Sequence, residues 1–194
     1  MARRSLPALL AVLLLLALAG GASAELKKGK VSGGVFKSPD GITFRVPSGF
    51  RLARQGYGKR DFFRIVFGGP SDSRGFGPAI VIDVMPQPGN ISEYTAQQVA
   101  RDLGEFPVAD VDKYVDMSVL SDKVTGEGDA AVRENLVVFR LDRFSEARVA
   151  FSYTYSFSTQ NHLVRASYMC FGAQRTLTDD IPKFRTLHDT LVVP

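Results

Sequence analysis

Histidine and cysteine, which often perform catalysis or bind metals, are rare in this chain of 194 residues. There are two histidines, His162 and His188, and one cysteine, Cys170. The histidines do not form an HxxxH or HExxH pair, the spacings with which helices present metal ligands. The alternation around Cys170 predicts a buried strand position, where a thiol packs as a small hydrophobe and is not a nucleophile. GxSxG and SxxK motifs are also missing, so the sequence predicts a protein that is not an enzyme and has no metal or cofactor.

One set of polar residues has the spacing of a binding surface. Small hydroxyl residues alternate with apolar ones along residues 148–158, and residues 163–171 add a cation. Because side chains alternate across a strand, these groups share one face. The pattern predicts a shallow site for an anionic or polar partner, but a solvated face or one covered by a helix fits it too. The members are Ser152, Thr154, Ser156, Ser158, Arg165 and Ser167.

A glycine-rich segment, residues 68–78, supplies a second candidate contact. A phosphate-binding loop requires Lys-Ser/Thr and a helix after its glycines, whereas here Pro78 and another predicted strand follow. We therefore interpret the segment as a connection between strands. Its tip, Arg74 and Phe76, is a candidate contact for a partner.

These candidates depend on a long predicted hairpin, residues 148–171. Phe151, Tyr153, Tyr155 and Phe157 alternate with the small polar residues, which is typical of a strand with one buried face. A two-residue turn, centred at either 160–161 or 161–162, pairs residues whose numbers have an odd sum. Such a turn places the odd-numbered aromatic residues of the first strand opposite even-numbered apolar residues of the second. The apolar faces of the two strands then coincide.

The remaining elements follow from the same periodicities. Alternation predicts strands over residues 62–67, 79–85, 115–124 and 132–141, and a hairpin over residues 35–46. Helical spacing predicts a helix over residues 90–104 and a closing helix over residues 178–191, with Pro182 in its first turn. The expected fold class is α+β. It consists of an antiparallel sheet of about six to eight strands flanked by helices, in an α/β/α sandwich.

The first 24 residues have the pattern of a secretory signal peptide. Two arginines precede an apolar run at residues 6–19, which is short for a membrane span, and small residues follow. Cleavage is expected between Ala24 and Glu25, with an uncleaved anchor as the alternative. No stable membrane insertion is expected after cleavage.

The rest of the chain predicts a single domain. Removal of the signal leaves 22 Lys or Arg against 20 Asp or Glu, interspersed along 170 residues. This balance predicts no nucleic-acid partner. Residues 25–32 predict a flexible lead, and residues 33–194 one domain with a core of its own.

Four short phrases carry a resemblance to a known family. They are Phe44-Arg-Val-Pro47-Ser-Gly49-Phe50, Ser92-Glu-Tyr94, Gln160-Asn161-His162 and Phe184-Arg-Thr-Leu187. With the order of elements, they resemble the PsbP-like superfamily. That group includes the lumenal extrinsic subunit of photosystem II, a eukaryotic Ran-binding protein and exported bacterial proteins of the DcrB type. Phe50 stands where many of these relatives carry Trp.

The resemblance implies an antiparallel sheet between helices in a protein that binds other proteins without catalysis. No binding residue is carried over from it, because the members bind unrelated partners. The expected function is that of an exported, soluble accessory protein of the bacterial envelope, periplasmic or secreted, that contacts an envelope protein. Two alternatives are a periplasmic carrier of a small molecule or lipid, and a hydrolase of unrecognised type.

Overall fold

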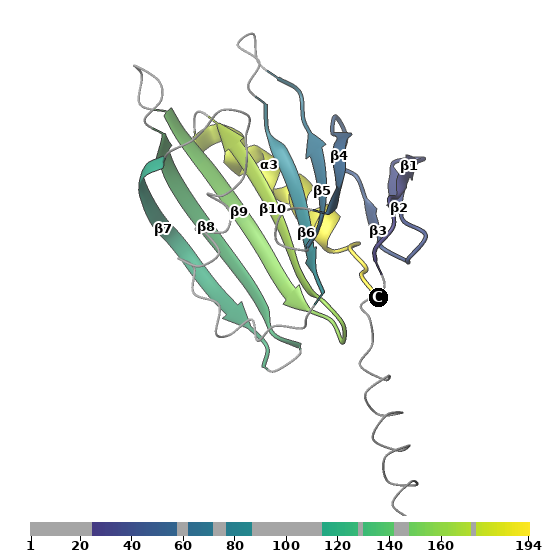
Figure 1. Ribbon diagram of the computed structural model, residues 1–194. Helices are drawn as coiled ribbons and strands as arrows, with labels where there is room; N and C mark the ends of the chain where they lie inside the picture. The colour runs from purple at the N-terminus through teal and green to yellow at the C-terminus, as the bar shows by residue number, and fades with distance from the viewer. Residues whose placement is uncertain are drawn as a thin grey trace, which may run out of the picture.

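The chain is mainly β and forms two antiparallel sheets and one helix in the part that the structure describes. A computed structural model describes residues 25–57, 62–71, 77–86, 114–127, 130–141, 148–171 and 174–194. The small sheet contains β1 (Lys30–Ser32), β2 (Val35–Lys37) and β3 (Thr43–Arg45), in that order. The strands of the large sheet are β4 (Arg51–Tyr57), β5 (Phe63–Gly68), β6 (Ala79–Met85), β7 (Tyr114–Thr125), β8 (Val132–Leu141), β9 (Arg148–Ser158) and β10 (Leu163–Phe171). They lie in the order β4-β5-β6-β10-β9-β8-β7, and the helix is α3 (Gln174–His188) (Figure 1).

The hairpin of β9 and β10 lies inside the large sheet with the predicted register. Phe157 pairs with Val164, and Tyr153 pairs with Tyr168. The turn is centred at residues 160–161, because the backbone N–H of Thr159 donates to the carbonyl of His162 at 2.7 Å. The two apolar faces therefore coincide, and the predictions for this hairpin and for its flanking strands are confirmed.

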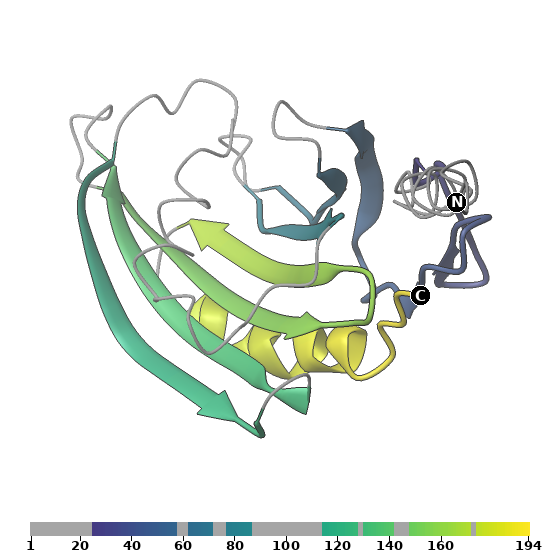
Figure 2. The same ribbon diagram turned by 60° about the horizontal axis from the view of Figure 1, so that its bottom comes forward.

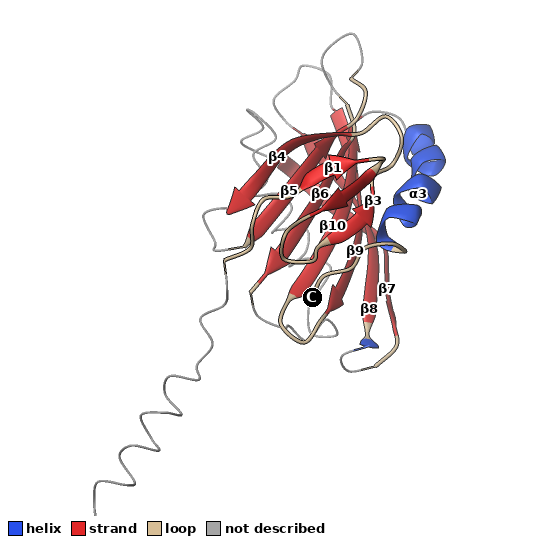
Figure 3. Cartoon of the chain, turned by 90° about the vertical axis from the view of Figure 1, so that its right-hand side faces the viewer, coloured by secondary structure: helices blue, strands red, loops and turns tan. Residues whose placement is uncertain are grey.

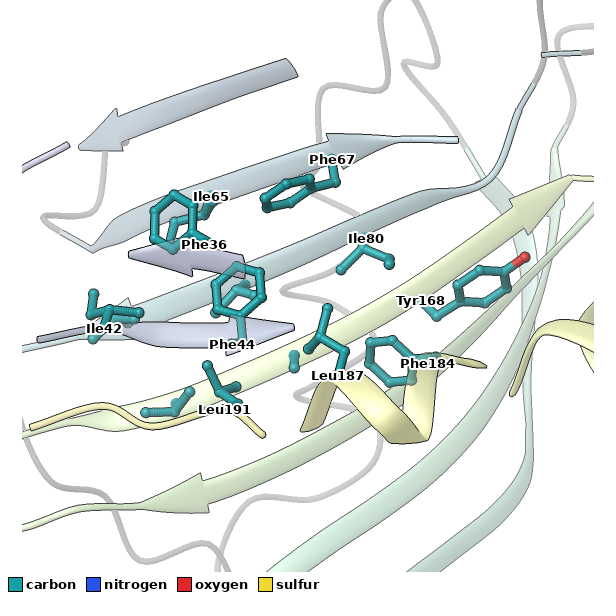
Figure 4. Close-up of a cluster of buried hydrophobic side chains, with 14 of the residues drawn as sticks. Phe36, Ile42, Phe44, Ile65, Phe67, Ile80, Tyr168, Phe184, Leu187 and Leu191 are labelled. Atoms are coloured by element: carbon teal, nitrogen blue, oxygen red, sulfur yellow. The ribbon is translucent and has the colours of Figure 1, made fainter. Parts of the chain in front are cut away.

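The apolar face of the large sheet is covered by two elements that lie side by side. The small sheet covers the part near β5 and β6, and α3 covers the part near β9 and β10 (Figures 2 and 3). Phe44 of β3 lies 5.6 Å, ring to ring, from Phe67 of β5, and Phe184 of α3 lies 5.7 Å from Tyr153 of β9. Figure 4 shows these two contributions meeting in one buried cluster. Burial of each such side chain stabilises the fold by about 1.5–3 kcal/mol.

The hairpin of β2 and β3 has the predicted turn. Gly41 has φ of 91°, and its N–H donates to the carbonyl of Ser38 at 3.2 Å. Glycine suits this position because positive φ costs it little. The rings of Phe36 and Phe44 stack at 4.8 Å, which places both in the core.

The closing helix begins earlier than predicted. It starts at Gln174, so Pro182 lies inside the helix and not in its first turn. Proline has no N–H to donate to the carbonyl four residues before it, so this turn lacks one hydrogen bond. Burial of the apolar face outweighs that loss, because Phe184 and Leu187 are fully buried and Ile181 packs against the core, as the spacing predicts.

Of two further predictions, one is corrected by the structure and the other concerns residues that the structure does not describe. Residues 30–32 of the expected flexible lead form β1, which pairs with β2. The helix predicted over residues 90–104 lies outside the described residues, so the described part has a helix on one face only and is not a clear α/β/α sandwich. Among the described residues, no helix is both long enough and apolar enough to cross a membrane.

Candidate functional site

The predicted polar set lies together on the face of the large sheet turned away from α3, which we call the polar face. Ser152, Thr154 and Ser156 on β9, with Arg165 and Ser167 on β10, are each at most 6% exposed. Ser158 is half-buried. The sequence therefore grouped these residues correctly, but the alternative of a solvated face is wrong. Their burial does not suit a surface that a protein partner reaches directly.

Charged residues from neighbouring strands join this face. Arg64, Asp83 and Arg165 stand opposite one another on β5, β6 and β10, and the row continues through Ser156 to Arg133 on β8. Asp83 accepts hydrogen bonds from Arg64 Nε at 2.7 Å and from Arg165 Nη2 at 2.8 Å. We call Arg64, Arg133 and Arg165 with Asp83 the arginine row. Arg64 and Arg165 are paired inside the sheet, because both guanidinium groups contact the Asp83 carboxylate, which is 1% exposed.

The last member of the arginine row, Arg133, contacts a different carboxylate, because its Nε donates to Asp122 Oδ1 at 2.7 Å. Hydroxyl and amide groups also lie on the polar face. The hydroxyl of Thr154 lies 3.3 Å from that of Ser152 and 3.1 Å from that of Ser167. In contrast, the amide group of Asn135 and the hydroxyl of Ser156 are buried without a hydrogen-bond partner. Polar groups in this state are ones that ordered water commonly satisfies.

The histidines and the cysteine are packed into the structure. His162 Nδ1 lies 2.8 Å from the carbonyl of Pro194. The ring of His188 stacks on Tyr155 at 4.1 Å, and burial lowers the pKa of His188. Cys170 is 1% exposed, as predicted, and burial raises the pKa of its thiol to about 11. The described residues contain no group of three or more potential metal ligands.

Most of the other predicted site residues are not among the residues that the structure describes. Arg74 and Phe76 lie among residues that the structure does not describe, as does Ala24. Glu25 is described and exposed, and it lines one wall of a cleft at the β4 edge of the molecule.

That cleft has a positive charge that the sequence analysis missed. Residues 25–57 contain seven Lys or Arg and two acids, whereas residues 58–194 contain fifteen Lys or Arg and eighteen acids. The overall balance hides this asymmetry, and a count by segment would have revealed it. The charged Arg64 and Asp83 inside apolar strand sequences were also missed, although a single charge in such a run indicates a buried ion pair.

The lead, residues 25–29, is held beside β4 by side chains. The amide of Gln55 accepts a hydrogen bond from Gly29 N–H and donates one to Gly29 C=O, both at 2.8 Å. The N–H of Leu26 donates to the hydroxyl of Tyr57. The N–H of Lys27 donates to Asp40. A Cβ on Gly29 would lie 2.4 Å from the Phe36 ring and 2.5 Å from the Lys37 carbonyl, so only glycine fits here.

Two clefts lie between this lead and β4, one on each side of the Gln55 contact. One has a volume of about 710 Å³ and the other about 840 Å³. Lys28 and Gln55 line both. We call the two together the lysine cleft; its cations are Lys27, Lys28, Lys30, Arg51 and Arg54. All five are exposed, and none forms an ion pair with another residue of the described ranges.

Apolar groups accompany these charges. Val31 is 41% exposed and Tyr57 is 38% exposed, and both line the cleft with the half-buried Leu26, Phe50 and Leu52. The aliphatic part of the Lys28 side chain adds to the apolar surface of the cleft, since its Cε lies near Gly56 of β4. An open groove with exposed cations, one carboxylate and an apolar floor can bind an acidic polypeptide, but it presents no catalytic group among the described residues.

Comparisons with known proteins place the fold but not the family. No family model matches the sequence, and no curated protein matches it either. The crystal structure of the Ran-binding protein Mog1p of Saccharomyces cerevisiae is similar, with a TM-score of 0.50 and 15% identity, over 82% of this chain and 87% of that one. A single-residue variant of protein Mog1 is similar with a TM-score of 0.48 and 15% identity, over 84% and 87%.

These findings correct three predictions. The assignment to the PsbP-like superfamily is wrong as made, because no family model matches and the similar solved structure is Mog1p. The function and localisation in the bacterial envelope are wrong, because that similar structure is a Ran-binding protein of yeast. The comparisons do not test the absence of catalysis, which stays a prediction. The predictions of a signal peptide and of secretion are not supported by the comparisons, and residues 1–24 lie outside the described residues.

Proposed function

We propose that this protein is a non-catalytic binding protein and that the lysine cleft contacts an acidic surface of a partner protein. The observation that carries the proposal is the contrast in charge between two parts of one molecule. Five exposed cations line the cleft with a single carboxylate, Glu25, whereas Arg64 and Arg165 are already paired with Asp83. Charge that has no ion-pair partner among the described residues is available to steer and orient an acidic protein.

The surface around the cations also suits a protein partner. Stable interfaces combine an apolar centre with a polar rim, and aromatic residues are enriched in the centre. Val31 and Tyr57 supply exposed apolar surface in the same cleft as the cations. Tyr57 is also fixed in place, since its ring packs edge-on at 5.4 Å against Phe63.

The similarity of fold supports a protein partner in general terms. Mog1p is named as a Ran-binding protein, and its structure covers most of this chain. A shared fold does not transfer a binding site, so the lysine cleft is argued from the residues of this chain alone. Ran is nevertheless the first defined protein to test as a partner.

The non-catalytic part of the proposal draws support from how the reactive groups are placed. His188 stacks against Tyr155, His162 contacts the C-terminal carbonyl, and Cys170 is buried with a raised pKa. A general base must lie within hydrogen-bond reach of a substrate, and a nucleophilic thiol must be ionised and accessible.

The helical layer predicted from residues 90–104, which an α/β/α sandwich requires, also stays a prediction.

Site-specific crosslinking tests the proposal. A photo-reactive amino acid replaces Val31 in the cleft or, as the control, Leu120, which is 53% exposed on β7 at the opposite edge of the sheet. Crosslinking in the native host and with purified Ran should yield an acidic partner from position 31 and not from position 120.

Charge reversal provides the second arm. The double substitution Lys28→Glu and Arg54→Glu should abolish that crosslink, and Lys123→Glu on β7 should leave it intact. A crosslink that forms equally well from both positions, or that survives the reversal in the cleft, would show that the lysine cleft is not the binding surface.

A further inference from the structure

We infer that the part of the partner that enters the lysine cleft is a short, extended, acidic segment, and that Gln55 positions the lysines that receive it. This inference rests on the proposed function and adds the chemistry and conformation of the bound element. It is carried by the shape of the cleft, the arrangement of its charges and the hydrogen bonds of Gln55.

The shape of the cleft favours an elongated occupant. The first half lies between Val31 and the start of β4, and the second continues past Gln55 to Tyr57 and Glu25. The two halves share residues and lie in line along β4, which is seven residues long. At about 3.3 Å per residue, this corresponds to roughly 23 Å, the length of an extended peptide of about seven residues.

The charges lie on both sides of this path. Lys27, Lys28 and Lys30 come from the lead and β1, and Arg51 and Arg54 come from β4. Successive side chains of an extended peptide point to opposite sides. A segment with acidic residues at successive positions therefore meets the lysines with one set of carboxylates and the arginines with the other.

Gln55 keeps the lysine side of the cleft in place. Its amide makes both hydrogen bonds of the Gly29 backbone, and Gly29 is packed so tightly against Phe36 that the backbone cannot approach further. Gly29 lies between Lys28 and Lys30 in the sequence, so its position sets theirs. A receptor that is already ordered loses less conformational entropy on binding, which raises affinity without any new contact.

Acidic peptide fits the cleft better than a nucleic acid strand does. The exposed apolar surface of Val31 is aliphatic, and Tyr57 is already packed edge-on against Phe63, whereas single-stranded nucleic acids require open aromatic faces on which bases stack. A phosphodiester strand is therefore the competing occupant that the experiment must exclude.

Fluorescence anisotropy with the full folded chain tests the inference. The probe is a labelled decapeptide of Glu alone, which carries carboxylates on both sides when extended, and its controls are the Gln counterpart and a labelled oligothymidylate. We expect the Glu peptide to bind at low salt and the Gln peptide to bind at least about tenfold more weakly, a difference of about 1.4 kcal/mol. The Lys28→Glu and Arg54→Glu pair should remove binding, and Lys123→Glu should not change it.

Gln55→Ala separates positioning from charge. It leaves every cation in place, so the slope of affinity against salt concentration should stay as in the wild type while affinity falls about threefold. In Lys28→Ala, by contrast, the slope itself should decrease, because one fewer charge takes part. An unchanged affinity in Gln55→Ala, with urea unfolding confirming a folded protein, would overturn the positioning role.

The outcomes distinguish this inference from the proposed function. If the Glu peptide does not bind but a partner protein still crosslinks through position 31, the cleft binds a folded acidic surface and the segment inference is wrong. Tighter binding of the oligothymidylate than of the Glu peptide would also overturn it. If charge reversal changes neither peptide binding nor protein crosslinking, the proposed function itself fails.

Discussion

The arginine row and the lysine cleft are both rich in cations, but they differ in what surrounds the charge. Asp83 lies between Arg64 and Arg165 with 1% exposure, so its contacts are part of the folded core. The cations of the lysine cleft are exposed, and Glu25 is the one carboxylate among the residues that line it. Buried charge that is paired contributes to which structure forms, whereas exposed charge without an ion-pair partner remains available for association. Removal of charge from the arginine row should therefore lower stability, whereas removal of charge from the lysine cleft should weaken binding.

The largest effect is expected from Asp83→Asn in the arginine row. The substitution keeps the shape but takes away the carboxylate that the buried guanidinium group of Arg165 and the half-buried one of Arg64 contact. This change should reduce the free energy of unfolding by about 3–5 kcal/mol. Urea unfolding measures this loss. Glu127→Gln, an exposed acid after β7, is the matched control and should cost under about 0.5 kcal/mol. Equal losses in the two variants would show that the arginine row is not a stabilising unit.

The next effect concerns the backbone that positions the lysine cleft. Gly29→Ala places a Cβ against the Phe36 ring and the backbone carbonyl of Lys37, and the carbonyl cannot move away as a flexible side chain does. Overpacking of this kind should cost about 1–3 kcal/mol in urea unfolding. Gly33→Ala is the control for space, because nothing lies near its Cβ, although its φ of 57° adds some strain of its own. A loss in Gly29→Ala no larger than in Gly33→Ala would mean that the lead is not held tightly.

The lead also shows where sequence reasoning reached its limit. Alternation predicted the hairpin of β9 and β10, its register and the burial of Cys170, because those follow from a period of two along one strand. The anchoring of residues 25–29 depends on Gln55 and Tyr57, which are about 26 to 31 positions away in the sequence. Contacts of that kind have no local pattern, so a polar segment was interpreted as flexible.

The candidate site was predictable only in part, and for a related reason. The hydroxyl residues of the polar face were grouped correctly by parity, but Asp83 and Arg64 come from strands that pair with β10 and β6 only in the folded sheet. Because Arg165 forms an ion pair with Asp83 in the folded sheet, its charge is not available to a partner as the sequence suggested. Similarly, Pro182 lies inside α3 because packing of Phe184 and Leu187 outweighs the local preference against proline.

Salt should separate the two regions by an effect of intermediate size. Raising the ionic strength from about 0.1 M to about 1 M shortens the screening length from about 10 Å to about 3 Å. Affinity of the lysine cleft for the acidic peptide should therefore fall by about tenfold or more. The stability difference between wild type and Asp83→Asn should change little, because buried charges are screened less. A salt-insensitive affinity would contradict electrostatic binding, and a stability difference that disappears at high salt would contradict a buried arginine row.

The smallest effect is expected from pH, through a histidine that lies outside both cationic regions. Histidine is the side chain whose ordinary pKa lies between pH values of about 5 and 8. His188 is the candidate, because burial lowers its pKa, and the charges of Asp189 and Glu134 oppose that shift while Arg185 adds to it. Its ring is half-buried between Tyr155 and Phe184, which favours the neutral form in the folded state.

The sign of this pH effect follows from the direction of the shift. Near its ordinary pKa of about 6.5, the unfolded chain binds more protons at this position than the folded chain does. The contribution of His188 is therefore complete above pH 6.5 or so, and it is lost as the pH falls through that value toward the lowered pKa of the folded state. His188→Phe keeps a ring against Tyr155 without a titrating group, so urea unfolding should show a smaller loss of stability on acidification than in the wild type. Parallel profiles would mean that His188 is as accessible to protons in the folded state as in the unfolded one.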